Sequence, residues 1–150
     1  HQEMQENTKQ SRGKDYMIKA KEPKVFTLEE AKRTLPFVKS IVSDIIESHH
    51  VLKELDEKIP LITNLNERRK SIFQQEYMKK QSTECLKEIA QVGCHLKDPK
   101  LGIIGYYWDR GDGVIAELTW QNGDEDIYYW NELGKDTLYP LEKKNKKERT

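Results

Sequence analysis

The sequence has few cysteines and no long apolar run, and both shortages narrow the class of protein. Its two cysteines, Cys85 and Cys94, fit neither a disulfide framework nor a paired zinc site. Cysteine used so sparingly is typical of a reduced environment, so we expect the protein to be cytoplasmic. No apolar run approaches the roughly 20 residues that a transmembrane helix needs, so we expect no membrane partner.

An excess of charge of either sign is also absent. The chain has 26 basic and 26 acidic residues, and this balance argues against nucleic acid as a partner, because nucleic-acid-binding domains usually carry a basic excess. Hydrophobic and charged residues each make up 35% of the 150 residues, whereas ordinary globular chains are more apolar and less charged. We therefore expect a modest core, long solvated helices and association of copies.

The apolar patterns divide the chain into three parts. Residues 1–24 are polar and show no periodicity, so we expect them to be disordered. Residues 25–141 hold the periodic patterns and should form a single domain. Within this domain, residues 101–141 carry two basic and eight acidic side chains. Residues 142–150 form a basic tail that should be flexible.

Two long helices are predicted in the first half of the domain. Thr27 and Glu30 have the spacing of a capping box, which favours a helix start. Apolar residues then follow at alternating spacings of four and three, interrupted by one histidine. This seam comprises Ala31, Leu35, Val38, Val42, Ile45, His49 and Leu52. Pro60 should end the helix, and a second helix should run from Leu65 to Val92, where Gly93 can form the C-terminal cap.

The two helices should pair as an antiparallel hairpin, because only the short link 60–64 separates them. Residues 74–84 of the second helix are mostly polar, so the pair leaves part of the first helix's seam uncovered. A second copy of the chain would cover it. We therefore expect a homodimer formed largely through coiled-coil contacts of the long helices.

After Pro99 the apolar pattern changes to alternation, which indicates strands. Strands are predicted at 102–109, 114–120 and 126–130, and Asn122-Gly123 is a strong hairpin signal. The predicted fold is therefore α+β: a long antiparallel helical hairpin followed by a small three-stranded antiparallel sheet packed on it.

Three separated stretches resemble a known family in order, spacing and residue type. They are Phe26-Thr27-x-Glu29-Glu30-Ala31 with Leu35-Pro36, Val92-Gly93-x-x-Leu96-Lys97-Asp98 with Gly102, and Trp120 with Ile127 and Trp130-x-x-Leu133. Together they are similar to the uncharacterised bacterial family known as domain of unknown function 2203, over residues 26–141. The resemblance implies membership of that family and no particular activity.

The chain departs from the family's pattern at polar positions. Gly105 stands where the pattern has aspartate, and Asn131 stands where it has histidine. Residues 138–141 keep the final proline and leucine of the pattern but lack its glycine–arginine pair. The packing positions are therefore kept, while the positions best suited to chemistry have changed.

Polar residues where the second helix meets the sheet are the strongest candidates for a site. In the functional interpretation, a pocket gathers His95, Lys97, Asp98, Tyr107, Glu117, Tyr129 and Glu132. A histidine beside carboxylates can act as a general base or hold a metal. In the structural interpretation, Lys97 interacts with the negative end of the helix dipole and Asp98 opens a turn. The sequence leaves both interpretations open.

No motif assigns a catalytic residue, a cofactor or a metal. A nucleophile elbow and a phosphate-binding loop are both missing from the sequence. His49 and His50 are adjacent, so they point to different faces of a helix and do not form the one-turn pair of a helical zinc site. We therefore expect no cofactor and no metal, and the sequence does not decide whether the chain is an enzyme.

Aromatic residues crowd the predicted strands: Tyr106, Tyr107, Trp108, Trp120, Tyr128, Tyr129 and Trp130. Neighbouring strand residues face opposite sides, so rings should lie on both faces, and the outer rings would form a docking surface for a protein partner. The leading hypothesis is a non-enzymatic interaction or scaffold module that self-associates through its long helices. The alternative is a small-molecule-binding protein or hydrolase-like enzyme with a site around His95, Lys97 and Asp98.

Overall fold

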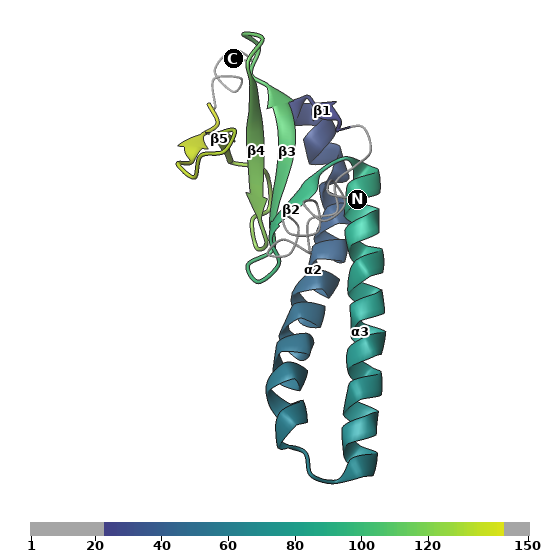
Figure 1. Cartoon of the computed structure of the whole chain (residues 1–150). Coiled ribbons are helices and arrows are strands. Elements are labelled where there is room, and N and C mark those ends of the chain that lie inside the picture. The colour runs from purple at the N-terminus through teal and green to yellow at the C-terminus, as the bar shows by residue number, and fades with distance from the viewer. Residues whose placement is uncertain (1–22, 143–150) are drawn as a thin grey trace, which may run out of the picture.

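The computed structural model describes residues 23–142 and shows a two-helix hairpin joined to a sheet (Figure 1). In chain order the elements are β1 (Val25–Phe26), α2 (Leu28–Lys58), a short 3₁₀ helix (Ile59–Leu61), α3 (Leu65–Val92), β2 (His95–Asp98), β3 (Ile103–Asp109), β4 (Ile115–Gln121), β5 (Tyr129–Glu132) and β6 (Tyr139–Pro140). This order confirms the α+β class. The segments expected to be disordered or flexible lie almost entirely outside the described residues.

Helix α2 begins as the sequence predicts. The Thr27 hydroxyl accepts a hydrogen bond from the Glu30 N–H at 3.1 Å, and the Glu30 carboxylate accepts one from the Thr27 N–H at 2.9 Å. The hydrogen bond from the Thr27 backbone lowers the pKa of Glu30. The seam is buried from Ala31 to Ile45, whereas His49 and Leu52 are only half-buried. Only the first half of the seam, from Ala31 to Ile45, is therefore part of the core.

Helix α3 has the predicted bounds. The Asn64 side chain accepts the Glu67 N–H at 3.1 Å at its start. Gly93 ends it with a φ of 103°, in the left-handed region that favours glycine. Neither this helix nor α2 has an apolar stretch of the length that a membrane crossing requires.

Within residues 23–142 the sheet has six strands, so the prediction of three was wrong in number. The predicted antiparallel meander is present as β3, β4 and β5, although β5 begins at Tyr129 rather than at residue 126. The additional strands are β1, β2 and β6. β2 pairs antiparallel with the first half of β3, β1 pairs parallel with its second half, and β6 pairs with β5. Each has two to four residues, which is too short to show alternation in a sequence.

One face of the sheet packs on the hairpin. Ile104, Tyr106, Leu118 and Trp120 project from this face, and each is 0% exposed. They form one apolar core with α2 residues from Ala31 to Ile45 and with Cys85, Leu86 and Ile89 of α3. The Tyr106 hydroxyl lies 2.7 Å from the Thr34 hydroxyl, and burial raises the pKa of Tyr106. We call residues 25–45 and 81–92, which flank this core, the base of the hairpin.

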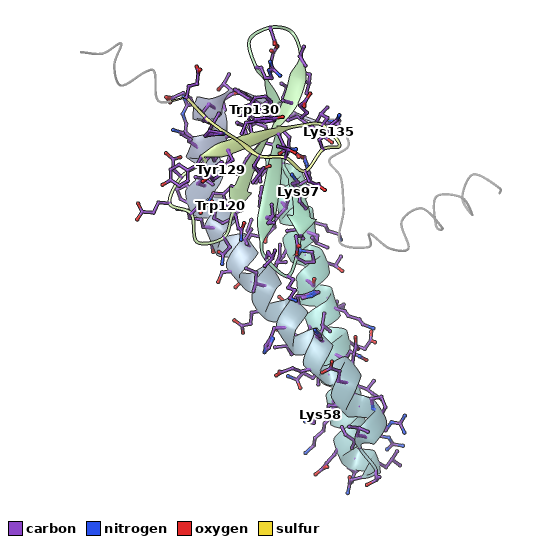
Figure 2. All side chains as sticks on the ribbon, turned by 90° about the vertical axis from the view of Figure 1, so that its left-hand side faces the viewer. Lys58, Lys97, Trp120, Tyr129, Trp130 and Lys135 are labelled. Atoms are coloured by element: carbon purple, nitrogen blue, oxygen red, sulfur yellow. The ribbon has the colours of Figure 1, made fainter. Side chains whose placement is uncertain are left out.

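The hairpin extends well beyond the sheet (Figure 1). We call residues 46–80 the tip region, and Lys58 lies near its far end (Figure 2). The buried residues in this range are Ser48, Leu55 and Ser71. Its large exposed apolar side chains are Leu61, Leu65, Ile72, Phe73 and Tyr77. In the described part of the chain no ion pair joins α2 to α3. Because Leu55 is the one buried apolar residue between residues 46 and 80, packing is dense at the base and sparse toward the tip.

Candidate functional site

The face of the sheet that points away from the helices carries a group of polar side chains. We call this group the polar cluster; it consists of His95, Lys97, Glu117, Thr119 and Asn131. Strand register brings its members together, because His95 and Thr119 both lie opposite Gly105, while Glu117 lies opposite Asn131. Apart from Lys97, every member is at most 8% exposed. Lys97 lies on the same end of the molecule as Tyr129, Trp130 and Lys135 (Figure 2).

Glu117 is the centre of the polar cluster. Its Oε2 contacts His95 Nε2, and its Oε1 accepts hydrogen bonds from Lys97 Nζ at 2.8 Å and from Asn131 Nδ2 at 2.9 Å. Burial opposes ionisation of this carboxyl, but the hydrogen bonds from His95, Lys97 and Asn131 outweigh it and lower the pKa of Glu117 to about 2. The carboxylate is therefore ionised at neutral pH, and because it can only accept, His95 Nε2 carries the hydrogen.

Further hydrogen bonds join Lys97, Thr119 and Asn131 of the cluster to one another. Thr119 Oγ1 donates to Asn131 Oδ1 at 2.5 Å, and Lys97 Nζ lies 3.2 Å from Thr119 Oγ1 and 3.4 Å from Asn131 Oδ1. Asn131 Nδ2 also reaches the carbonyl oxygens of Glu132 and Lys135. Every buried side-chain nitrogen and oxygen in residues 23–142 has a hydrogen-bond partner. The Tyr107 ring lies 4.8 Å from the imidazole of His95 and covers one side of it.

Gly105 makes the contact between His95 and Glu117 geometrically possible. A Cβ at this position would lie 2.4 Å from Glu117 Oε2 and 2.6 Å from His95 Nε2, far inside normal contact distance. The two side chains therefore meet in the space above the glycine, which lies on β3 between β2 and β4. The requirement for glycine here comes from this close approach rather than from backbone conformation.

Four of the seven residues selected from the sequence lie together: His95, Lys97, Tyr107 and Glu117. Lys97 pairs with the carboxylate of Glu117, a contact that the structural interpretation of this lysine did not include. Asp98 does open a turn, because its Oδ1 accepts the N–H groups of Lys100 and Leu101 at 2.8 and 3.0 Å.

The other two selected residues do not take part in the polar cluster. Tyr129 lies opposite Thr119 in the sheet, but its side chain is 41% exposed and its ring contacts the ring of Tyr128. Glu132 is exposed, and alternation along β5 directs it to the opposite side from Asn131. Its backbone oxygen, rather than its carboxylate, serves the cluster.

Sequence reasoning missed Thr119, Asn131 and the role of Gly105. Alternation already placed Thr119 on the same side as Glu117, so a signal for it was present. Asn131 joins the cluster only through the pairing of β5 with β4. A register that is not encoded by a two-residue turn is difficult to obtain from one sequence.

Comparison with known families gives one result. A family model described as "Uncharacterized conserved protein (DUF2203)" matches residues 24–137. The chain belongs to this family. The matched range includes both helices and all of the polar cluster. No curated protein and no solved structure matches the chain.

Gly105 and Asn131, two positions at which we expect a departure from the family's pattern, both lie at the polar cluster. Gly105 leaves the space in which His95 and Glu117 meet, and Asn131 donates to the carboxylate of Glu117. The aspartate of the pattern would not fit at residue 105 unless these two side chains moved, because even a Cβ is too close to them. The changes therefore concern one site rather than two separate positions.

Other groups that could support chemistry are not arranged for it. Within residues 23–142, His, Cys, Asp and Glu side chains form no group of three that could hold a metal ion. Cys94 is buried, and this burial raises the pKa of its thiol to about 12. At neutral pH the thiol is protonated and is a poor nucleophile. In the described part of the chain, the polar cluster is therefore the group of side chains best arranged for binding or catalysis.

The chemistry that the polar cluster can support follows from the orientation of His95. Glu117 fixes the imidazole by accepting from Nε2, which leaves Nδ1 as the acceptor when the ring is neutral. An imidazole oriented by a carboxylate is the arrangement of a general base. Lys97 is partly exposed, with 27% of its side-chain surface accessible, and it supplies positive charge at the rim.

Proposed function

We propose that this protein is a non-enzymatic interaction module that self-associates through its long helices. The observation that carries the proposal is the tip region, where two long helices extend beyond the sheet with few buried apolar residues. Phe73, at 76% exposed, and Leu65, at 60%, lie there without cover in the described chain. Exposed apolar groups that recur along one helix are typical of a surface that binds another protein.

A second copy of the chain is the partner that this proposal names. Two helices packed on each other bury less apolar surface than a bundle of four, so a tip region standing alone gains little from the hydrophobic effect. Closed twofold dimers are the commonest oligomers of such chains. Pairing of two tip regions covers the exposed side chains of both copies at once.

Sedimentation velocity over a concentration series tests the proposal. The wild-type chain should change from monomer to dimer as the concentration rises to high micromolar. Phe73→Glu should weaken the dimer at least tenfold, because a charge would then be buried in the contact. Tyr129→Glu, which alters an exposed ring on the sheet, is the matched control and should leave the dimer unchanged. A wild-type chain that stays monomeric, or a dimer that tolerates Phe73→Glu, would contradict the proposal.

The sheet end offers a second surface for a protein partner within the same proposal. Its exposed apolar side chains are Tyr128, Tyr129, Leu133, Leu138 and Tyr139. Acidic residues lie close to them in the sequence, including Asp124, Glu125 and Asp136. Aromatic rings within an acidic rim favour a partner of basic character. Tyr129→Ala tests this surface, because removing the exposed ring without changing the charge should weaken binding of a basic partner while leaving self-association intact.

A small-molecule-binding or hydrolase-like site at the polar cluster is a second candidate function. The observation that favours it is that the buried carboxylate of Glu117 contacts both the buried imidazole of His95 and the partly exposed ammonium group of Lys97. Apolar residues of similar size often stabilise a fold as well as a buried ion pair does. Stability alone therefore gives no reason for this arrangement, whereas a site needs an oriented imidazole and a nearby cation.

Native mass spectrometry of the protein purified from cells tests the second candidate. A bound molecule should be released on denaturation in an amount comparable to that of the protein. Lys97→Met should abolish its retention, because this change removes the cation at the rim of the cluster. Lys100→Met, three residues along in an exposed turn, is the matched control. Release of nothing from the wild-type protein, or equal retention by both variants, counts against the candidate.

A further inference from the structure

We infer that the two copies associate through α3 alone, in an antiparallel pair whose twofold axis passes beside Ile72 and Phe73. This inference rests on the proposed self-association and adds its contact surface and its register. The surface is the α3 stripe, which we define as Leu65, Ile72, Phe73 and Tyr77, at 60%, 40%, 76% and 56% exposed.

The α3 stripe lies on the side of the helix that α2 does not cover. The buried positions of α3, which face the hairpin partner and the core, are Ser71, Cys85, Leu86 and Ile89. Each residue turns an α-helix by about 100°. Phe73 therefore lies about 200° from Ser71, almost on the opposite side, and Leu65 and Ile72 share a face because they are seven residues apart. A partner that covers the stripe must approach α3 from outside the hairpin.

The charges beside the α3 stripe favour an antiparallel copy of the same helix. Arg69 and Glu76 are seven residues apart, so they lie two turns apart on one face, and Ile72 and Phe73 lie midway between them. A twofold axis at that midpoint places Arg69 of each copy against Glu76 of the other. Two ion pairs of opposite charge then flank a central pair of apolar contacts, which is the self-complementarity that a twofold interface requires.

A parallel arrangement of the same helices would oppose like charges, with arginine against arginine and glutamate against glutamate. Such pairs destabilise helical contacts and select against the wrong orientation. Arg69 has no ion pair within the described residues, and Glu76 has only a long contact of 3.8 Å with Lys79. Both side chains are exposed and can take a partner from another molecule.

The same axis also gives a neighbour to Leu65, at the N-terminal end of the α3 stripe. Leu65 and Lys80 are equidistant from the midpoint, on opposite sides of it. In the antiparallel pair, the aliphatic stem of Lys80 can therefore cover Leu65 of the other copy while its ammonium group remains in water. Leu65, Ile72 and Phe73 of the stripe then each have a neighbour in the dimer.

Charge reversal tests this register. We expect Arg69→Glu and Glu76→Arg each to raise the dimer dissociation constant at least tenfold, because each places like charges together twice. An equimolar mixture of the two variants should recover wild-type affinity to within about threefold, since both contacts in the mixed dimer are then of opposite charge. Both changes in one chain should restore association in the same way. Lys53→Glu and Glu57→Arg, exposed on α2, are the matched controls and should have little effect.

The possible outcomes distinguish a failure of the α3 register from a failure of the proposed self-association. A wild-type dimer that responds to Arg69→Glu no more than to Lys53→Glu would overturn the α3 register and leave self-association standing. A wild-type chain that is monomeric at high micromolar concentration would overturn both. An anionic membrane surface is the other partner that a helix with basic and apolar side chains could bind. Vesicles of equal parts phosphatidylcholine and phosphatidylserine test for it. Binding to them by a monomer that does not associate would also overturn the register.

Discussion

The base and the tip region of the hairpin are made of the same two helices, yet they differ in how they are stabilised. At the base, α2 and α3 bury apolar side chains against a sheet, and the central residues Val38 and Val42 are 0% exposed. In the tip region the same helices bury Ser48, Leu55 and Ser71 and expose Phe73. A helix needs tertiary packing for most of its stability. The base receives that packing from within the chain, and in this account the tip region receives it from a second copy.

The sheet shows a similar contrast between its two faces. The face on the helices is apolar, while the other face carries the polar cluster, whose members apart from Lys97 are also buried. A polar cluster that satisfies all its hydrogen bonds holds the strands in one register, because a slip would leave charges unpaired. Stability should therefore depend strongly on changes in the base and the sheet and weakly on changes in the tip region.

The largest loss is expected when the polar cluster loses its central charge. Glu117→Leu should destabilise the fold by about 3–5 kcal/mol, because it removes the acceptor of buried His95 and the counter-charge of Lys97. Glu117→Gln should cost less, since an amide can still accept from Lys97. Denaturant unfolding measures both. Equal small losses for the two variants would show that the carboxylate is not the centre of the cluster.

A matched pair of isoleucines compares the base with the tip region directly. Ile45→Ala, at a position 2% exposed, should cost about 2–5 kcal/mol through lost burial and a cavity. Ile72→Ala, at a position 40% exposed, should change the stability of the dilute monomer by no more than about 0.5 kcal/mol. Thermal unfolding at a concentration below association gives both values. Similar losses at the two positions would remove the distinction between base and tip.

The helices and their ends could be predicted from the sequence because their signals are local. Thr27 with Glu30 and Gly93 with its left-handed turn are short-range features, and both are present in the structure. The strands β1, β2 and β6 could not be predicted, because so short a strand exists only through its tertiary partner. His95, Lys97 and Glu117 could be selected as polar residues near a joint. Their convergence with Asn131 depends on strand register, which no local pattern specifies.

Acid should lower the free energy of unfolding through protonation of the Glu117 carboxylate. Folding lowers the pKa of Glu117 from 4.5 to about 2, so between these values the unfolded chain binds more protons than the folded chain. Stability supplied by this group is complete above about pH 4.5 and is lost as the pH falls toward 2. At about 1.4 kcal/mol for each pKa unit, the loss is on the order of 3 kcal/mol. Unfolding free energies measured from pH 6 downward should fall less steeply for Glu117→Gln than for the wild type.

Among the changes at the polar cluster, the smallest loss of stability is expected at Gly105. Gly105→Ala should cost about 1–3 kcal/mol, because the new methyl group forces His95 and Glu117 apart. Gly123→Ala is the comparison for an exposed turn, where a Cβ meets nothing but the φ of 103° is unfavourable. Chemical shifts of the His95 ring should change in the first variant and not in the second. An unchanged ring in Gly105→Ala would contradict the crowded geometry.

Hydrogen exchange of individual amides tests the central difference between base and tip most directly. At a concentration where the copies are separate, the amides of residues 66–80 should exchange much faster than those of residues 85–92, which pack on the sheet. At high micromolar concentration the amides of residues 66–80 should become at least tenfold more protected, while those of the base stay unchanged. Equal protection along the whole of α3 at the low concentration, with no dependence on concentration, would contradict the account.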